Sequence, residues 1–177
     1  MLLSKEAIKQ VKLLQSFSSK DHHFDHFEQL NNFYYDNSEE RFVATDGRAM
    51  ITIHKSRIAD VTETGFYKLD GNELVKADCE RQFPNWKRVV PDYKGSTCTK
   101  HLVSITKDLM CLGQLHAEIV LNFNIWLNIE YLKKVPEGIY DFYRAKDDAM
   151  KAVVLQPCPS VEIIIAPMNH QDTYLTV

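Results

Sequence analysis

The residues whose types and spacing could do chemistry are few, and the densest group is HHFDHF at 22–27. His22, His23 and His26 lie close together there, with the carboxylate of Asp25 among them. Imidazoles three or four residues apart on a helix can share a metal ion, and a carboxylate adds an oxygen ligand. No second ligand group elsewhere in the sequence has matching spacing, and histidines in a polar connecting segment are usually solvated. We therefore expect no bound metal and no cofactor.

Motifs for covalent catalysis and phosphate binding are missing from the sequence. No serine lies in a GxSxG elbow, and the 6 glycines form no phosphate-binding loop. The 4 cysteines form no CxxC pair, which argues against a zinc ribbon and against a dense disulfide framework. Asp147 and Asp148 lie in a predicted turn, and turn formation explains them. We expect a protein that is not an enzyme and has no catalytic residue.

The stretch VATDGRAM, Val43–Met50, is the strongest local signal in the chain. An Asp-Gly pair between two β-prone runs predicts a hairpin, because both central residues of a tight two-residue turn need positive φ. Taken alone, this pattern predicts a turn and no chemistry.

Length and composition indicate a globular protein without a strong electrostatic field. The chain has 177 residues, 45% of them hydrophobic, and a formal net charge of −3. Such a charge does not attract nucleic acid or anionic lipid to the whole molecule, so contact with either needs a local basic patch. No apolar run approaches the length of a membrane span or a signal sequence. We expect a cytoplasmic protein with reduced thiols and no membrane partner.

The first element expected is a helix that begins after Ser4 and runs to about Phe17, with Ser4 as its cap. Its apolar side chains recur with helical spacing and predict a buried face: Ala7, Val11 and Leu14. Its lysines gather almost opposite: Lys5, Lys9 and Lys12. A solvated face is the ordinary interpretation of such a lysine stripe, and a basic binding surface is the alternative.

The next segments alternate like strands and are separated by turn residues. We expect strands within 30–36, 41–44, 49–55 and 62–71. The two prolines and the glycine of 83–96 predict an irregular connection in the middle of the chain.

The second half is expected to contain helices and a second meander. Residues 100–116 predict a helix, which could start as a strand, and 118–123 predict a strand. Asn124 is expected to cap a helix from Ile125 to Val135 that Pro136 ends, because the residue before proline disfavours the α region. The buried stripe of that helix would be Ile125, Ile129 and Leu132. Three strands are expected to follow, at 138–144, 149–156 and 161–168.

Taken together, these elements predict an α+β fold, with helices packed on one face of antiparallel sheets and two helix-plus-meander halves. We expect a single domain over 1–177. Its first half would be 1–90, its connection with a helix 91–115, and its second half 116–177.

Several segments resemble the bacterial sliding clamp, the β subunit of DNA polymerase III. VATDGRAM is similar to the VATDGHRLA-like turn of that family, and FPNWKRVVP is similar to its FPDYRRVLP-like segment. NFNIWLNIEYLKKV followed by EIIIAPMN resembles the last helix and terminal strand of the clamp, which ends in a VMPMRL-like tail. LNNFYYD resembles an LNGMLFE-like strand. The motifs occur in the family's order, and together they cover about half of the chain.

The resemblance implies a fold in which helices line the inside of a ring around DNA and strands form its outer wall. The lysines of the first helix would then contact phosphates without reading bases, and so would Lys133 and Lys134. Only one clamp-like domain, or two half-domains, fits in 177 residues. A ring would then need about six copies of a one-domain chain.

In clamps the three motifs come together as a pocket for a short hydrophobic peptide of polymerases, clamp loaders and repair proteins. By residue matching, the resemblance implies that the lining here is Leu30, Thr45, Gly47, Arg48, Pro84, Val89, Asn124, Leu127, Ile164, Ala166, Pro167 and Met168. The sequence departs from the family pattern at three points. The histidine after the glycine is missing, Ala166 replaces a methionine, and Asn169 replaces the terminal arginine.

The leading hypothesis is a clamp-like processivity protein of DNA replication. It would bind the clamp-binding peptide of a polymerase or clamp-loader partner, with or without encircling duplex DNA as a homo-oligomer. One alternative is a decoy or regulator that keeps the pocket without a ring. The other is a clamp fold recruited to an unrelated binding role, for which the histidine cluster would be the first candidate.

Overall fold

The computed structural model describes residues 1–19, 29–95 and 97–168. The histidine cluster and Asn169 lie outside these residues. The chain divides into two compact units, each described here by itself. Unit 1 comprises Met1–Asn85 with Ser160–Glu162, and unit 2 comprises Trp86–Pro159 with Ile163–Val177.

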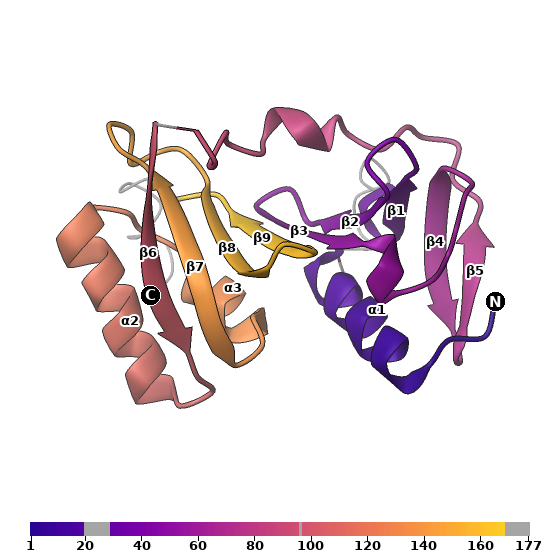
Figure 1. Cartoon of the computed structure of the whole chain (residues 1–177), viewed down its shortest axis with the longest axis horizontal. Helices are drawn as coiled ribbons and strands as arrows, with labels where there is room; N and C mark the ends of the chain where they lie inside the picture. The colour runs from indigo at the N-terminus through magenta and orange to yellow at the C-terminus, as the bar shows by residue number, and fades with distance from the viewer. Residues whose placement is uncertain (20–28, 96, 169–177) are drawn as a thin grey trace. The chain divides into compact units, whose positions relative to one another are not determined.

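Unit 1 begins with helix α1, Lys5–Phe17, which lies against strands β2 and β3 (Figure 1). Ser4 caps α1, since its hydroxyl accepts the Ala7 N–H at 3.1 Å. The strands are β1 (Phe33–Asp36), β2 (Arg41–Thr45), β3 (Ala49–His54), β4 (Gly65–Asp70) and β5 (Glu73–Ala77). Their order is β5-β4-β1-β2-β3, and each strand is antiparallel to its neighbours in this order. The predicted helix and the four predicted strands are confirmed, whereas β5 was not expected.

The core of unit 1 is built from large aromatic and aliphatic side chains. Phe33, Tyr35 and Phe42 are at most 1% exposed, and the Tyr35 and Phe42 ring centres lie 4.8 Å apart. Val11 and Leu14 of α1 are fully buried as well. A helix whose apolar face is covered in this way is stabilised mainly by packing and less by its intrinsic propensity.

A buried ionic cluster lies on β2, β3 and the first residues of the last strand, β9 (Val161–Ile165). Arg41 donates to the Thr52 hydroxyl at 2.9 Å, and its guanidinium lies 3.4 Å from the Glu162 carboxylate. The Thr52 hydroxyl in turn donates to Glu162 at 3.2 Å. Nearby, the His54 N–H donates to the Ser160 carbonyl at 2.8 Å. These bonds belong to unit 1 and connect residues that are far apart in the sequence.

Unit 2 contains three strands besides β9 and two helices. The strands are β6 (Cys98–Ile105), β7 (Gly138–Ala145) and β8 (Val153–Cys158), and the helices are α2 (Leu109–Phe123) and α3 (Ile129–Lys134). Their order is β9-β8-β7-β6, and β6–β7 and β7–β8 are antiparallel. Helix α2 runs alongside β6 (Figure 1) and contacts α3. The three strands expected after Pro136 are confirmed.

The middle of unit 2 differs from the expectation. Residues 118–123 are the end of α2 and not a strand, so the predicted strand is wrong. Asn124 has φ 54° and ends α2 as a left-handed C-cap instead of beginning a helix. Asn128 caps the following helix, its side chain accepting the Glu130 N–H at 2.9 Å, and that helix starts at Ile129. Ile125 is therefore buried outside a helix.

The α+β class is confirmed, with helices packed against antiparallel sheet in two helix-plus-strand units. The irregular connection contains a 3₁₀ turn, η3, at Trp86–Arg88. Among the described residues, no helix combines the length and the apolar character that crossing a membrane requires.

Candidate functional site

The hairpin turn between β2 and β3 is fixed by its own side chains. The Thr45 hydroxyl donates to the Ala49 carbonyl at 2.7 Å and accepts the Gly47 N–H at 3.0 Å. The Asp46 carboxylate accepts the N–H groups of Arg48 and Ala49 at 3.0 and 2.9 Å. The backbone is thereby held in one shape, and the Arg48 side chain is exposed.

The shape of this turn corrects the tight two-residue geometry that the Asp-Gly pair predicts. Strand β2 ends at Thr45 and β3 begins at Ala49, so three residues lie between the strands, and the Asp46 N–H donates to the Ala49 carbonyl at 3.3 Å. Gly47 has φ 90°, whereas Asp46 is not among the residues with positive φ. Asp46 shapes the turn through its carboxylate and not through a left-handed backbone.

Two other predicted pocket residues of unit 1 lie on separate segments. Leu30 is 5% exposed, and its carbonyl accepts the Ser19 N–H at 2.9 Å, next to the end of α1. Pro84 is exposed and follows Phe83, whose ring stacks on Tyr34 with 4.9 Å between ring centres. Leu30 therefore contributes to the core. Pro84 lies at the surface, next to Phe83, whose ring is held by Tyr34.

In unit 2, hydrogen bonds bring the chain after β9 to the segment between α2 and α3. The Met168 N–H donates to the Trp126 carbonyl at 2.7 Å. The His116 Nε2 lies 2.7 Å from the Leu127 carbonyl, and because a carbonyl only accepts, this nitrogen carries the proton. Leu127 and Met168, matched separately to the clamp pocket, are thus next to each other. The sequence did not indicate Trp126 or His116. Trp126 takes part through its backbone carbonyl, and His116 takes part through its ring.

Val89 lies directly after η3. Its N–H donates to the Trp86 carbonyl at 3.2 Å, and its side chain is 58% exposed. Trp86 is 9% exposed, so the turn is anchored by one aromatic ring while Val89 faces solvent. The Val89 side chain is therefore accessible to solvent.

The twelve residues matched to the pocket differ in accessibility within their units. Leu30, Leu127 and Ile164 are buried, at 5, 2 and 3% exposure. Thr45, Pro167 and Met168 are partly exposed. The remaining six are exposed: Gly47, Arg48, Pro84, Val89, Asn124 and Ala166.

Solved structures with the same arrangement of elements are DNA polymerase III beta subunits. The chain is similar to that of Thermotoga maritima, with a TM-score of 0.60, 15% identity and coverage of 96% of this chain and 66% of that one. For the beta subunit of Borrelia burgdorferi the TM-score is 0.59 and the identity 13%, with coverage of 96% of this chain and 64% of that one. For the DNA polymerase sliding clamp of Pseudomonas aeruginosa the TM-score is 0.54 and the identity 12%, with coverage of 95% of this chain and 67% of that one. The chain has the sliding-clamp fold.

The resemblance seen in the sequence is thereby confirmed at the level of the fold. The chain spans a little under two thirds of the length of the Thermotoga and Borrelia clamps, at 66 and 64%. No protein-family profile and no curated protein sequence matches it.

In this clamp fold, the lysines of α1 form an accessible stripe. Lys5, Lys9 and Lys12 are all exposed. Lys9 is 3.0 Å from Glu6, one turn away on the same helix, and both side chains are at least 70% exposed. An ion pair of this kind is weak and does not prevent the lysine from contacting another anion.

The two lysines at the end of α3, Lys133 and Lys134, each contact another side chain of the same helix. Lys133 lies 2.5 Å from Glu130. The Lys134 ammonium lies 4.8 Å from the centre of the Tyr131 ring. A third lysine, Lys107, donates to the carbonyls of Lys133 and Val135 at 2.8 and 2.6 Å. Lys107 therefore caps the end of α3, where a cation suits the helix dipole.

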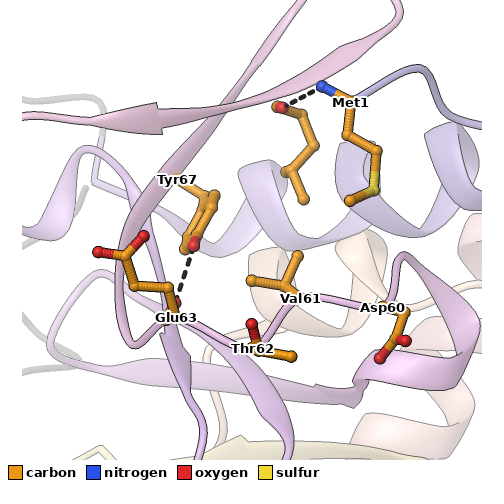
Figure 2. A pocket seen from close by; sticks show the side chains of 7 residues that line it. Met1, Asp60, Val61, Thr62, Glu63 and Tyr67 are labelled. Carbon is orange, nitrogen blue, oxygen red and sulfur yellow. Dashed lines mark hydrogen bonds between the residues drawn. The ribbon is translucent and has the colours of Figure 1, made fainter.

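Unit 1 also contains a pocket of about 220 Å³ that the sequence did not indicate (Figure 2). The Tyr67 hydroxyl donates to the Glu63 carbonyl at 2.8 Å, beside the apolar side chain of Val61. The carboxylates of Asp60 and Glu63 pair with lysines outside the pocket. The lining residues are Met1, Asp60, Val61, Thr62, Glu63, Tyr67 and Leu74. This pocket shares no residue with the set matched to the clamp peptide pocket.

Proposed function

We propose that this chain is a non-enzymatic, clamp-like accessory protein of DNA replication that binds clamp-binding peptides. The observation that carries the proposal is the likeness to DNA polymerase III beta subunits over 96% of the chain, at a TM-score of 0.60. The three sequence motifs add to it, because they are the segments that form the peptide pocket in clamps. The partner would be a polymerase or a clamp-loader protein that presents a short hydrophobic peptide.

The geometry within each unit supports peptide binding. In unit 1, hydrogen bonds hold the backbone of the β2–β3 turn in one shape, and the Arg48 side chain is exposed on it. In unit 2, the Trp126–Met168 bond places Met168 beside the buried Leu127. Rigid apolar surface with a few polar groups is typical of sites that anchor short peptides, because little order has to be gained on binding.

The test of peptide binding is fluorescence anisotropy with a labelled clamp-binding peptide. Arg48→Ala and Met168→Ala should each raise the dissociation constant by about tenfold, a typical loss for one interface contact. Arg57→Ala and Met150→Ala are the matched controls, because both residues are exposed and neither belongs to the predicted pocket. Failure of the native chain to bind at high micromolar concentration would remove the peptide-binding proposal.

We further propose that the chain encircles duplex DNA as a homo-oligomer. Among the residues that the structure describes, the strand order ends at β6, whose one neighbour is β7. The Lys146 N–H donates to the Thr97 carbonyl at 3.0 Å, so alternate residues from Thr97 onward bond to β7. The backbone groups of Lys100, Leu102 and Ser104 therefore point to the open side, where a strand of another copy could pair.

Gel filtration with light scattering tests the ring. We expect a closed oligomer whose formation is prevented by Leu102→Pro, because proline removes a backbone donor from the open edge. Leu102 is 71% exposed, so the substitution removes little packing inside the unit. A strict monomer at high concentration would exclude the ring and leave peptide binding to be judged on its own.

A second candidate function is a decoy or regulator that binds clamp partners without loading on DNA. The observation that favours it lies at the other edge strand, β5. Residues Met1–Leu3 pair along it: the Leu3 N–H donates to the Asn72 carbonyl at 2.9 Å, and the Leu74 N–H donates to the Met1 carbonyl at 2.8 Å. Part of this edge is therefore already occupied. Peptide binding by a chain that stays monomeric would support this second function.

A further inference from the structure

We propose that His116 is a positioning residue for the peptide-binding surface of unit 2, acting through the backbone of the segment between α2 and α3. The inference deepens the proposed function and rests on it, because it concerns the same pocket. His116 lies outside the twelve residues matched to clamp motifs. Its effect on a bound peptide would be transmitted by two residues that are among them, Leu127 and Met168.

The imidazole of His116 joins a helix to the short segment that follows it. His116 lies in the middle of α2 and is half-buried. Its Nε2 donates to the Leu127 carbonyl at 2.7 Å, 11 residues further along the chain. The ring therefore ties the backbone at Leu127 to a helix of 15 residues, which its own regular hydrogen bonds keep stiff.

Helix caps fix both ends of this segment. The Asn124 N–H donates to the Val120 carbonyl at 2.9 Å and ends α2. The Asn128 side chain accepts the Glu130 N–H at 2.9 Å and begins α3. Each of these bonds is local to one helix end, so neither reaches the chain after β9. The link to that part of the chain is made in the middle of the segment.

Two neighbouring carbonyl groups carry this link. The Trp126 carbonyl accepts the Met168 N–H at 2.7 Å, and the next carbonyl, that of Leu127, accepts from His116. The two carbonyls belong to successive planar peptide groups, which are joined by the two soft backbone dihedrals of Leu127. Fixing the second group with His116 therefore restricts the orientation of the first, and with it the position of Met168.

The bond to Trp126 is important for Met168 because the strand has already ended there. Strand β9 ends at Ile165, and Pro167, which precedes Met168, has no backbone N–H. The Met168 side chain is partly exposed while its backbone is held by the Trp126 carbonyl. A residue held in this way needs less ordering when a peptide binds, so the affinity is higher.

Hydrogen exchange followed by NMR tests the coupling without any peptide. His116→Leu keeps a bulky side chain but removes the donor, so the Met168 N–H should exchange about tenfold faster. His116→Gln should restore slow exchange, because the glutamine amide nitrogen also donates and has a similar reach. The Lys146 N–H, which donates to the Thr97 carbonyl at 3.0 Å in the same unit, is the reference and should exchange as in the native chain. A general loss of stability would instead speed up both amides.

The peptide test uses the full chain and a labelled clamp-binding peptide in fluorescence anisotropy. His116→Leu should raise the dissociation constant by about fivefold, the factor expected for one hydrogen bond of ordinary strength, and His116→Gln should restore the native value. Gln114→Leu is the matched control, because Gln114 is exposed and points about 200° away from His116 around the same helix. It should leave both the dissociation constant and the exchange of Met168 unchanged.

The two measurements separate the ways in which the proposal could fail. Unchanged exchange of the Met168 N–H in His116→Leu would overturn it, whether or not the peptide binds. An unchanged dissociation constant in His116→Leu, where Met168→Ala still raises it, would overturn the role of His116 and leave peptide binding intact. If His116→Gln behaves like His116→Leu, the ring acts by packing and not as a donor, and the proposal is wrong. Failure of the native chain to bind the peptide would remove the proposed function, and the role of His116 in the pocket with it.

Discussion

At the scale of single residues, His101 shows how packing changes the chemistry of a titratable group. Its ring lies 4.5 Å from the Phe123 ring centre, and its Nε2 lies 3.3 Å from the Thr99 hydroxyl. Burial lowers the pKa of His101, and the nearby Arg144 guanidinium lowers it further. The neutral imidazole is therefore the form that unit 2 favours.

The first prediction concerns the titration of His101. The imidazole of the unfolded chain takes up its proton near pH 6.5, whereas the folded state resists protonation. The stability contributed by neutral His101 is thus fully present above about pH 6.5 and is lost as the pH falls through the lower pKa of the folded state. Arg144→Ala should raise the pKa of His101 toward 6.5 without reaching it, because burial is the larger cause. NMR titration of the ring measures this, and a pKa at or above 6.5 in the native protein would contradict it.

At the scale of elements, the Arg41–Thr52–Glu162 cluster connects β9 to β2 and β3 within unit 1. The side chains of Arg41 and Glu162 are only 17 and 7% exposed, so removal of one leaves a poorly solvated charge. A long-range ionic contact of this kind also helps to fix strand register, because a shift of one residue would turn Glu162 to the other face.

The second prediction concerns the stability of this cluster. Glu162→Ala should lower the free energy of unfolding by about 3 kcal/mol, since it leaves Arg41 without its carboxylate partner. Replacing both residues with apolar ones, in Arg41→Met/Glu162→Leu, should recover much of the loss. Glu130→Ala, which breaks the exposed pair with Lys133, is the control and should cost less than about 1 kcal/mol. Urea denaturation measures all three, and equal losses for Glu162→Ala and Glu130→Ala would contradict the burial argument.

The elements that could be predicted from the sequence are those with a strong local signal. Helix α1 has a Ser4 cap and an apolar period, and β2 and β3 flank an Asp-Gly pair, so local physics determines them. The segment Ile119–Leu121 was misinterpreted because a short apolar run with β-branched residues fits a strand as well as a buried helix. Asn124 was misplaced because asparagine suits both the start of a helix and the left-handed position at its end.

The candidate site could be predicted only in part, for a different reason. Its residues came from similarity to clamp motifs, and such similarity does not reveal which side chains are accessible. Leu127 and Ile164 are buried, while Val89 is exposed, because the packing of whole elements decides this. The Trp126–Met168 bond joins backbone groups, which every residue type carries, so no residue pattern indicates it.

At the scale of the whole molecule, charge limits how the chain could hold DNA. A formal net charge of −3 provides no general attraction to a polyanion, so a duplex would have to be held by local cations. Helix α1 supplies an exposed lysine stripe, whereas α2 has no lysine or arginine. The lysines of α3 are less available to phosphates than those of α1, because Lys133 pairs with Glu130. DNA contact is therefore expected to depend mainly on α1.

The third prediction tests this difference between helices through salt dependence. Each phosphate contact contributes about 0.9 to the slope of log affinity against log salt concentration, because a condensed counterion is released. Replacing Lys5, Lys9 and Lys12 together by glutamine should therefore reduce the slope by about 2 to 3. The matched control replaces Lys68, Lys94 and Lys151, which are equally exposed but lie on strands and loops. Anisotropy with a labelled duplex between ~50 and ~200 mM salt measures the slopes. Both variants lose three positive charges. If the slope changes less for the α1 variant than for the control, the phosphate contacts do not lie on α1 and the prediction is wrong.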